Sequence, residues 1–292
     1  CDAGALRRSR HAVVVAARMR AVAKTLGAVT IVGVAWALSL SAAAQDPEDR
    51  GALVVDEWDA GSIAVAGRMI RTRVVFPGAT GSYPLVGVIH GAARTGAQHI
   101  ELARTFASRG FVVVLPDMPC TLGACDHDAN ASQIAALLDW ALAQSGTLGS
   151  RIDGRVDGER IGLVGHSWGA LASHIAASRD ARIDSLVLFD PNDDGTVGLT
   201  ATPGVRAPTL QLLASVPGFC NSQWDEAMVT PLLPEPKLQL TVSRSGHCDP
   251  EEPGDAICPI GCGAGDASLS GIFRRYAVAW TTCNLTGDAT MG

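Results

Sequence analysis

Residues 165–169 read G-H-S-W-G and form the stretch of this sequence best suited to chemistry. The serine hydroxyl of a G-x-S-x-G motif is a nucleophile when it sits on a sharp turn between a buried strand and a helix. The apolar run 161–164 is typical of a buried parallel strand, and apolar residues recur at helical spacing over 170–175. We therefore predict that Ser167 is a catalytic nucleophile rather than part of an ordinary glycine-rich turn.

Near neutral pH a serine nucleophile needs a positioned base, and two histidines follow Ser167 in the chain. His174 lies two turns along the predicted helix and points away from the turn. His247 follows the last clear strand, in a loop from which its side chain can reach over the sheet. We predict His247 as the base, and the alternative is a solvated loop histidine.

The base in turn needs a carboxylate that orients it and stabilises its protonated form. Asp190 ends the strand that follows the serine's helix, and catalytic groups in open α/β sheets gather at such carboxyl ends. We predict Asp190 as the acid, with Asp193, Asp194 and Asp225 as the alternatives. If Asp190 is not catalytic, we expect it to cap backbone amides in a solvated turn.

Backbone amides must bind the oxyanion that forms when the serine attacks a carbonyl. The amide of Trp168 is one candidate because it directly follows the nucleophile. Ala92 or Ala93 is the other candidate, because both follow the predicted strand 84–90 and Gly91 lets that backbone come close. We also predict that Ala93 and the Trp168 indole bind substrate, and the alternative for the indole is plain packing on the helix.

Neither a metal ion nor a cofactor is expected. His127 lies within the run D-H-D at 126–128, but three adjacent residues cannot all face one ion, so we predict a solvated loop there. Cys258 and Cys262 have metal-like spacing with His247 nearby, yet no second close pair of ligands accompanies them.

The elements that must position these residues begin with three segments containing β-branched residues between 52 and 76, which we predict to be antiparallel edge strands. From residue 84 onward apolar strands alternate with helices, the strands over 84–90, 111–115, 161–164, 183–189, 209–213 and 238–242 and the helices over 98–109, 134–142, 170–175 and 272–280. This alternation predicts an α/β fold with a mostly parallel central sheet and helices on both faces. No long helical insert is apparent, so we expect no large lid and an exposed site.

The N-terminal region has the three parts of a secretory signal, namely basic residues at 18, 20 and 24, an uncharged run over 25–45 and alanines at 42–44. We predict that residues 1–44 are upstream residues plus a signal peptide, with Met19 as the true start. The alternative is an uncleaved membrane anchor. Residues 45–292 then form a single catalytic domain that is secreted or periplasmic and has no stable membrane association.

Without residues 1–44 the chain has 17 basic and 28 acidic residues. An acidic domain binds nucleic acid poorly, so we expect no nucleic-acid partner, and we expect a monomer. In an exported protein seven cysteines are more typical of disulfides than of metal ligands: Cys120, Cys125, Cys220, Cys248, Cys258, Cys262 and Cys283. The odd count leaves one cysteine unpaired or engaged elsewhere.

Several motifs carry a resemblance to known families. The runs V-I-H-G-A-A-R-T, L-A-R-T-F-A-S-R-G-F-V-V-V-L-P-D, V-D-G-E-R-I-G-L-V-G-H-S-W-G-A and Y-A-V-A-W-T-T-C are similar to those of bacterial cutinase-like polyester hydrolases. The runs L-F-D-P-N-D-D-G and S-G-H-C-D-P-E look more like plant chlorophyllases. The resemblance spans Arg71 to Leu285, and it implies an α/β-hydrolase fold and ester hydrolysis by Ser167, Asp190 and His247.

The sequence also departs from both families. It lacks the aspartate that polyester hydrolases carry after the next strand, and it has Trp168 where chlorophyllases usually have arginine. The resemblance further implies a disulfide between Cys220 and Cys248, and pairing of Cys283 with Cys258 or Cys262.

We therefore expect a secreted serine hydrolase that cleaves esters, small or polymeric, through an acyl-enzyme intermediate, and that is cutinase-like or degrades polyesters. One alternative is a chlorophyllase-like or lipid esterase. Another is a peptidase or amidase that uses the same three residues. The third is a non-catalytic binding domain that kept the fold.

Overall fold

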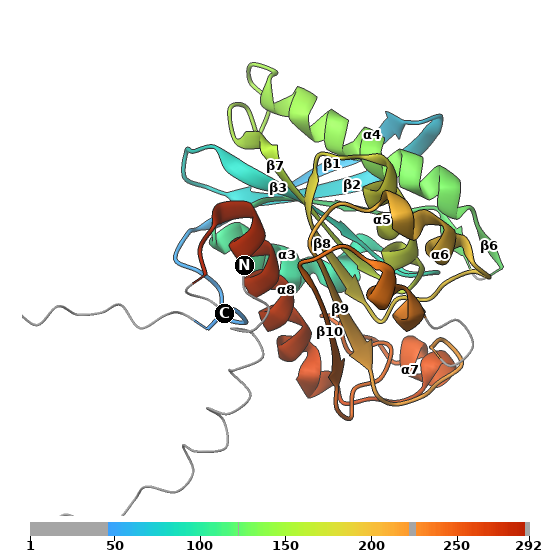
Figure 1. Ribbon diagram of the computed structural model, residues 1–292. Helices are drawn as coiled ribbons and strands as arrows, with labels where there is room; N and C mark the ends of the chain where they lie inside the picture. Colours follow the sequence, from blue (N-terminus) through green and yellow to red (C-terminus); the bar gives the residue numbers. More distant parts are fainter. Residues whose placement is uncertain (1–45, 122, 222–225, 290–292) are drawn as a thin grey trace, which may run out of the picture.

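The computed structural model describes residues 46–121, 123–221 and 226–289 (Figure 1). The predicted signal peptide and Asp225 lie outside these residues. The chain is built on an eight-stranded sheet in the order β1-β2-β4-β3-β7-β8-β9-β10. These strands are β1 Val55–Val65, β2 Arg68–Pro77, β3 Tyr83–Ile89, β4 Val112–Pro116, β7 Val156–His166, β8 Ile183–Phe189, β9 Thr209–Ala214 and β10 Lys237–Val242.

The N-terminal edge of the sheet is antiparallel, as predicted, because β2 runs opposite to both β1 and β4. The prediction of three separate strands there is wrong. Most of the first two segments belongs to one long strand, β1, which continues through a register shift between Asp59 and Gly61. All strand pairs from β4 to β10 are parallel, so the mostly parallel sheet is confirmed.

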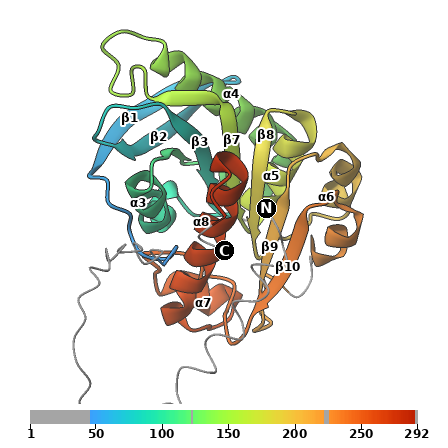
Figure 2. The same cartoon turned by 60° about the vertical axis from the view of Figure 1, so that its left-hand side comes forward.

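Helices cover both faces of this sheet (Figures 1 and 2), as the alternating pattern predicted. One face is covered by α3 and α8, and buried Phe106 and Trp280 lie in its core. The other face is covered by α4 and α5, with Leu137 and Leu171 in the core beneath them. The helices are α3 Ile100–Ser108, α4 His127–Ser145, α5 Trp168–Arg179, α6 Val197–Ala201, α7 Ile257–Cys262 and α8 Ser270–Thr286, with short 3₁₀ turns η2 Gly96–His99, η3 Thr202–Gly204, η4 Glu226–Leu232 and η5 Ala267–Leu269.

The segment predicted as a solvated loop around His127 is instead ordered and partly buried. A small hairpin, β5 Cys120–Thr121 and β6 Ala124–Cys125, is closed by a disulfide between its two cysteines. Asp126 then caps α4 by accepting a hydrogen bond from the amide of Ala129 at 2.9 Å. His127 is the first residue of that helix and is buried, so the solvated-loop prediction for it is wrong.

The parallel part of the sheet brings together residues that are far apart in the sequence. Ser167 follows β7, Asp190 follows β8 and His247 follows β10 by five residues. Because carboxyl ends of parallel strands meet at one edge, all three loops open on the same side of the sheet. Within the residues that the structure describes, each helix is too short or too polar to cross a membrane.

Candidate active site

The turn at Ser167 joins β7 directly to α5 in a backbone conformation unusual for a non-glycine residue, with φ 57° and ψ −127°. The glycines on either side of it are required by close packing. A Cβ on Gly169 would lie 2.2 Å from the carbonyl oxygen of His90, and one on Gly165 would lie 2.5 Å from Cα of Ala170. The G-x-S-x-G spacing therefore lets a strand and a helix pass close together and holds the serine between them.

His247 and Asp190 form a buried hydrogen-bonded pair. Asp190 Oδ2 lies 2.7 Å from His247 Nδ1, across 57 residues of sequence. The same oxygen accepts a second hydrogen bond, from Asn221 Nδ2 at 3.1 Å, and Asp190 Oδ1 accepts one from the amide of Ala214 at 2.7 Å. These donors fix the carboxylate, and a carboxylate held on Nδ1–H leaves the Nε2 lone pair of the imidazole available as a base.

The alternative acids lie elsewhere. Asp193 accepts hydrogen bonds from two amides in the first turn of α6, including that of Gly198 at 2.8 Å, so its carboxylate is engaged there. Asp194 is exposed, and its Oδ2 lies 3.5 Å from His127 Nε2. Neither side chain is hydrogen-bonded to His247 in the described structure.

Two asparagines at the site were missed in the sequence. Asn192 is buried, donates to the carbonyl of Cys220, and places its Nδ2 3.5 Å from Ser167 Oγ. Asn221 bonds Asp190 as described above. Only their positions in the sequence could have indicated a role at the site, since one lies two residues beyond the predicted acid and the other lies in the loop after β9.

The loop after β3 comes close to the serine, as an oxyanion-binding loop must. A Cβ on Gly91 would lie 2.9 Å from Ser167 Cβ. The amide of Ala93 donates to the carbonyl of Cys120 at 2.7 Å, so it is engaged, and Ala93 is not part of the cavity wall. Ala92 does line the cavity, as does Trp168.

Ser167 and His247 open into a cavity of about 490 Å³, which lies within the range typical of small-molecule sites. Trp168 lies between this cavity and the buried start of α4. It borders the cavity, and its ring lies edge-on to the buried ring of His127 with 5.2 Å between ring centres. The indole is thus a supported wall rather than a mobile surface group.

Buried polar contacts link the loops of the site from behind. His166 Nε2 donates to the carbonyl of His247 at 2.8 Å, and burial keeps the pKa of His166 well below its usual value, so its ring is neutral. Arg94 Nε donates to Glu251 Oε1 at 2.8 Å. Burial raises the pKa of the Glu251 carboxyl, and Arg94 opposes that rise. These bonds tie the serine turn, the loop after β3 and the His247 loop into one unit.

The disulfides near the site differ from those that the resemblance implied. Cys220 pairs with Cys262, and Cys248 pairs with Cys258. The implied Cys220–Cys248 bridge is therefore wrong, and so is the implied pairing of Cys283 with Cys258 or Cys262. The reason is that α7 carries one cysteine near each end, and each end faces a different loop.

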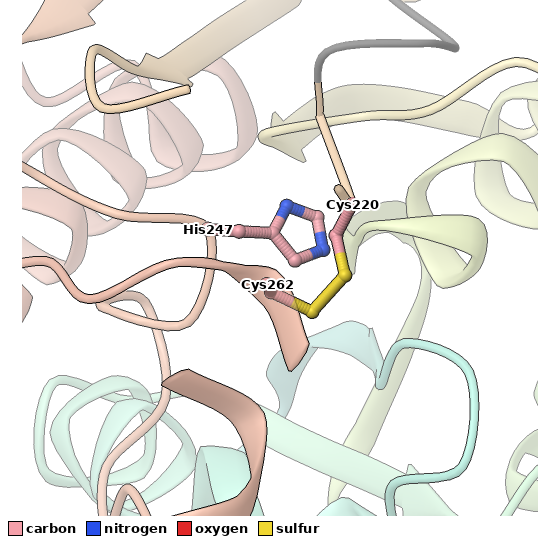
Figure 3. Close-up of side chains that lie close together, drawn as sticks. All are labelled: Cys220, His247 and Cys262. Atoms are coloured by element: carbon pink, nitrogen blue, oxygen red, sulfur yellow. A yellow bond between two sulfur atoms is a disulfide. The ribbon is translucent and has the colours of Figure 1, made fainter. Parts of the chain in front are cut away.

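The Cys220–Cys262 disulfide forms a wall beside the His247 ring (Figure 3). The two sulfurs and a ring nitrogen lie within 4.8 Å of one another, a spacing that also suits a metal ion. A metal ligand must be a thiolate, however, and both sulfurs are bonded to each other. With both sulfurs in a disulfide, these three side chains do not form a metal-binding set.

A mostly parallel sheet with a serine on a strand–turn–helix elbow, and with a histidine and an aspartate from later loops beside it, defines the α/β-hydrolase class. Within that class, a family described as PET hydrolase-like matches residues 49–226, more than half of the sequence. This chain belongs to that family.

Individual relatives are more distant. Over 184 residues the chain is 27% identical to cutinase cut1 of Thermobifida fusca, and the aligned stretch covers 59% of this chain and 56% of the cutinase. Over 164 residues it is 30% identical to a bis(hydroxyethyl) terephthalate hydrolase of Streptomyces coelicolor, covering 55% of this chain and 49% of that protein. The chain thus spans about half the length of the curated relatives it matches. Of the two resemblances in the sequence, these comparisons support the one to polyester hydrolases.

Proposed function

We propose that this protein is a secreted serine hydrolase that cleaves carboxylic esters, with Ser167 as nucleophile, His247 as base and Asp190 as acid. The observation that carries the proposal is the 2.7 Å bond between His247 and Asp190 at the cavity that contains Ser167. Membership of the PET hydrolase-like family supports an ester as the substrate.

In this mechanism, His247 Nε2 takes the proton of Ser167 Oγ as that oxygen attacks the ester carbonyl carbon. The tetrahedral intermediate collapses, the bond to the alkoxy group breaks, and the leaving alcohol takes the proton from His247. Water then attacks the acyl-enzyme, with His247 again accepting a proton. The acid leaves and Ser167 regains its proton, so the protein is unchanged at the end of the cycle.

The oxyanion formed in each half-reaction is assigned to the backbone amides of Trp168 and Ala92. Trp168 directly follows the nucleophile at the start of α5, where helix amides point toward a developing negative charge. Ala92 follows Gly91, where an added Cβ would lie 2.9 Å from Ser167 Cβ. One such donor is worth about 2.7–4 kcal/mol of barrier lowering.

Polyesters are the substrate class that the relatives' names suggest, since those names are cutinase and bis(hydroxyethyl) terephthalate hydrolase. Secretion is supported by the three disulfides among the described residues, which persist in oxidising compartments, and by the predicted signal peptide.

The test is hydrolysis of p-nitrophenyl butyrate by the wild type and by Ser167→Ala, together with labelling by a fluorophosphonate followed by mass spectrometry. We expect the wild type to be active and labelled on Ser167, and the variant to be inactive, unlabelled and folded. Ser132→Ala, on the outer side of α4, is the matched control and keeps full activity. A wild type that neither turns over the ester nor reacts would favour a non-catalytic domain, and faster cleavage of matched amides would favour a peptidase or amidase.

A further inference from the structure

Two segments beside the cavity contain no charged side chain and no free polar one. Residues 216–220 read V-P-G-F-C, and residues 256–265 read A-I-C-P-I-G-C-G-A-G. The cysteines in both are disulfide-bonded. The segments are in contact, since a Cβ on Gly218 would lie 1.8 Å from the carbonyl oxygen of Cys262. We call these two segments together the apolar rim.

The rim exposes large apolar side chains to solvent. Ile257 and Ile260 are 75% and 85% exposed and lie three residues apart on α7, so they face the same side. Phe219, on the other segment, is 56% exposed. Clustered exposure of this kind is unusual on a monomer and marks an interaction surface.

The isoleucines are not needed to hold α7 in place. Cys258 is the one buried residue of this helix, and it is bonded to Cys248 beside the predicted base. Cys262 at the other end is bonded to Cys220. Two covalent links anchor a six-residue helix, so its exposed face is free to serve another purpose. Figures 1 and 2 show α7 next to the ends of β9 and β10, on the side of the sheet where the site lies.

The rim is continuous with the cavity. Phe219, Cys220, Cys258 and Cys262 all line the cavity that contains Ser167. Ile257 and Ile260 do not line it and extend the same surface outward. A flat apolar surface in contact with the two isoleucines would therefore also lie over the mouth of the cavity.

The charge of the protein and of the rim indicates which kind of surface can bind there. The chain has a net charge of −6, and the rim has no lysine or arginine with which to bind phosphate. The nearby Asp255 is paired with Arg94 at 2.8 Å. An anionic lipid surface or a nucleic acid would meet an acidic protein through a rim that offers it no lysine or arginine. No electrostatic repulsion opposes contact with an uncharged apolar solid, and that contact removes the exposed isoleucines from water.

We propose that the apolar rim is an adsorption surface that holds the protein on an uncharged, water-insoluble polyester with the cavity over the polymer chain. This inference rests on the proposed function for the identity of the solid. It assigns to Ile257 and Ile260 a role in binding polymer that is separate from the chemistry at Ser167.

The experiment compares Ile257→Ser/Ile260→Ser with the matched control Leu148→Ser/Met69→Ser. Leu148 and Met69 are 95% and 65% exposed but lie in the α4–β7 connection and on β2, away from the cavity. Adsorption to polycaprolactone particles is measured by depletion from solution, with Ser167→Ala added to every protein so that the particles are not eroded. The same pairs with Ser167 intact are assayed on p-nitrophenyl butyrate and on the particles.

We expect the rim pair to lower particle affinity at least tenfold, because tenfold is about 1.4 kcal/mol and two isoleucines contribute more than that even when a flat surface covers only part of each. Hydrolysis of particles at low enzyme concentration falls in parallel, while kcat/KM on the soluble ester stays within about twofold, because neither isoleucine lines the cavity. The control pair changes none of these.

Equal adsorption of the rim pair and the wild type would overturn the proposal, as would an equal loss on the soluble ester. Two further results would also overturn it. In the first, the wild type binds phosphatidylglycerol vesicles as strongly as it binds the particles. In the second, the wild type is a dimer, and the two isoleucine substitutions make it a monomer without changing adsorption. If the wild type cleaves no ester but the adsorption difference persists, the proposed function fails and the rim proposal stands.

Discussion

Asp190 and His247 are hydrogen-bonded at 2.7 Å although one follows β8 and the other follows β10, so the strand β9 lies between the elements that carry them. The loop after β9 is where the polyester hydrolases that the sequence resembles carry their acid. In this chain, the end of β9 and that loop instead supply two donors to Asp190, the amide of Ala214 and the side chain of Asn221. In the triad that we propose, the acid thus follows β8 rather than β9, and the end of β9 with its loop supports it.

The first prediction follows from this pair. Asp190→Asn keeps the size of the side chain but replaces a carboxylate oxygen with an amide, so His247 no longer has an anion on Nδ1–H. We expect kcat on p-nitrophenyl butyrate to fall by about 10⁴-fold with little change in fold, as expected when the imidazole takes the wrong tautomer.

Asp193→Asn is the control for that experiment. The two oxygens of Asp193 each accept one amide of α6 and neither is hydrogen-bonded to His247, so the asparagine loses one acceptor, and we expect a loss of roughly 1 kcal/mol in unfolding free energy and an unchanged kcat. If Asp193→Asn removed activity and Asp190→Asn did not, the assignment of the acid would be reversed.

The second prediction concerns the approach of Gly91 to Ser167. A methyl group at residue 91 would meet Ser167 Cβ at 2.9 Å, so Gly91→Ala must push the serine turn and the loop after β3 apart. Displacements of about 1 Å in a catalytic arrangement cost on the order of 10²-fold. We expect kcat/KM on a soluble ester to fall by about that factor while circular dichroism stays unchanged.

Gly261→Ala is the matched substitution, because a Cβ there meets no atom within 4 Å. It should leave the soluble-ester rate as it is. A Gly91→Ala variant with wild-type kinetics would show that the loop after β3 has room to move, and would remove it from the oxyanion assignment.

Much of this architecture could be predicted because it depends on local pattern. The run before Ser167 is apolar, as buried parallel strands require, and the two glycines around the serine are required by close backbone contacts, Gly165 with the same turn and Gly169 with the end of the neighbouring strand β3. Asp190 and His247 were picked out because each comes at or soon after the end of a predicted strand, and ends of parallel strands converge whatever the rest of the chain does.

What the sequence could not predict depends on contacts between distant loops. The cysteine pairing is set by how α7 lies between Cys220 and Cys248, and no spacing along the chain encodes that. The burial of His127 depends on a disulfide hairpin that turns the chain back toward Trp168. Asn192 and Asn221 act through a single amide each, and asparagines in loops are too common to stand out.

The third prediction compares the two disulfides at the site. Cys220–Cys262 closes a loop of 42 residues and Cys248–Cys258 closes one of 10. If loop-closure entropy dominates, the double serine variant should lose about 4 kcal/mol of unfolding free energy in the first case and about 2.7 kcal/mol in the second. Urea unfolding of both variants measures this order. A larger loss from the shorter loop would mean that packing around His247, and not chain entropy, sets the value of these bonds.

The last prediction is loss of stability in acid, caused by buried histidines behind the site. His99 is fully buried beside His166, with ring centres 5.4 Å apart, and burial lowers the pKa of His99 to about 3. In the unfolded chain this pKa is near 6.5, so between pH 6.5 and 3 the unfolded state binds a proton that the folded state excludes. Stability therefore falls as the pH falls through that window, by up to about 1.4 kcal/mol per pH unit from this histidine. Glu251 acts in the opposite sense, because its raised pKa lets the folded state take up a proton first.

His99→Phe keeps an aromatic ring and removes the titrating group, so its unfolding free energy, measured in urea at pH 4, 5, 6 and 7, should depend less steeply on pH than that of the wild type. Parallel curves for the two proteins would show that His99 takes up its proton without unfolding.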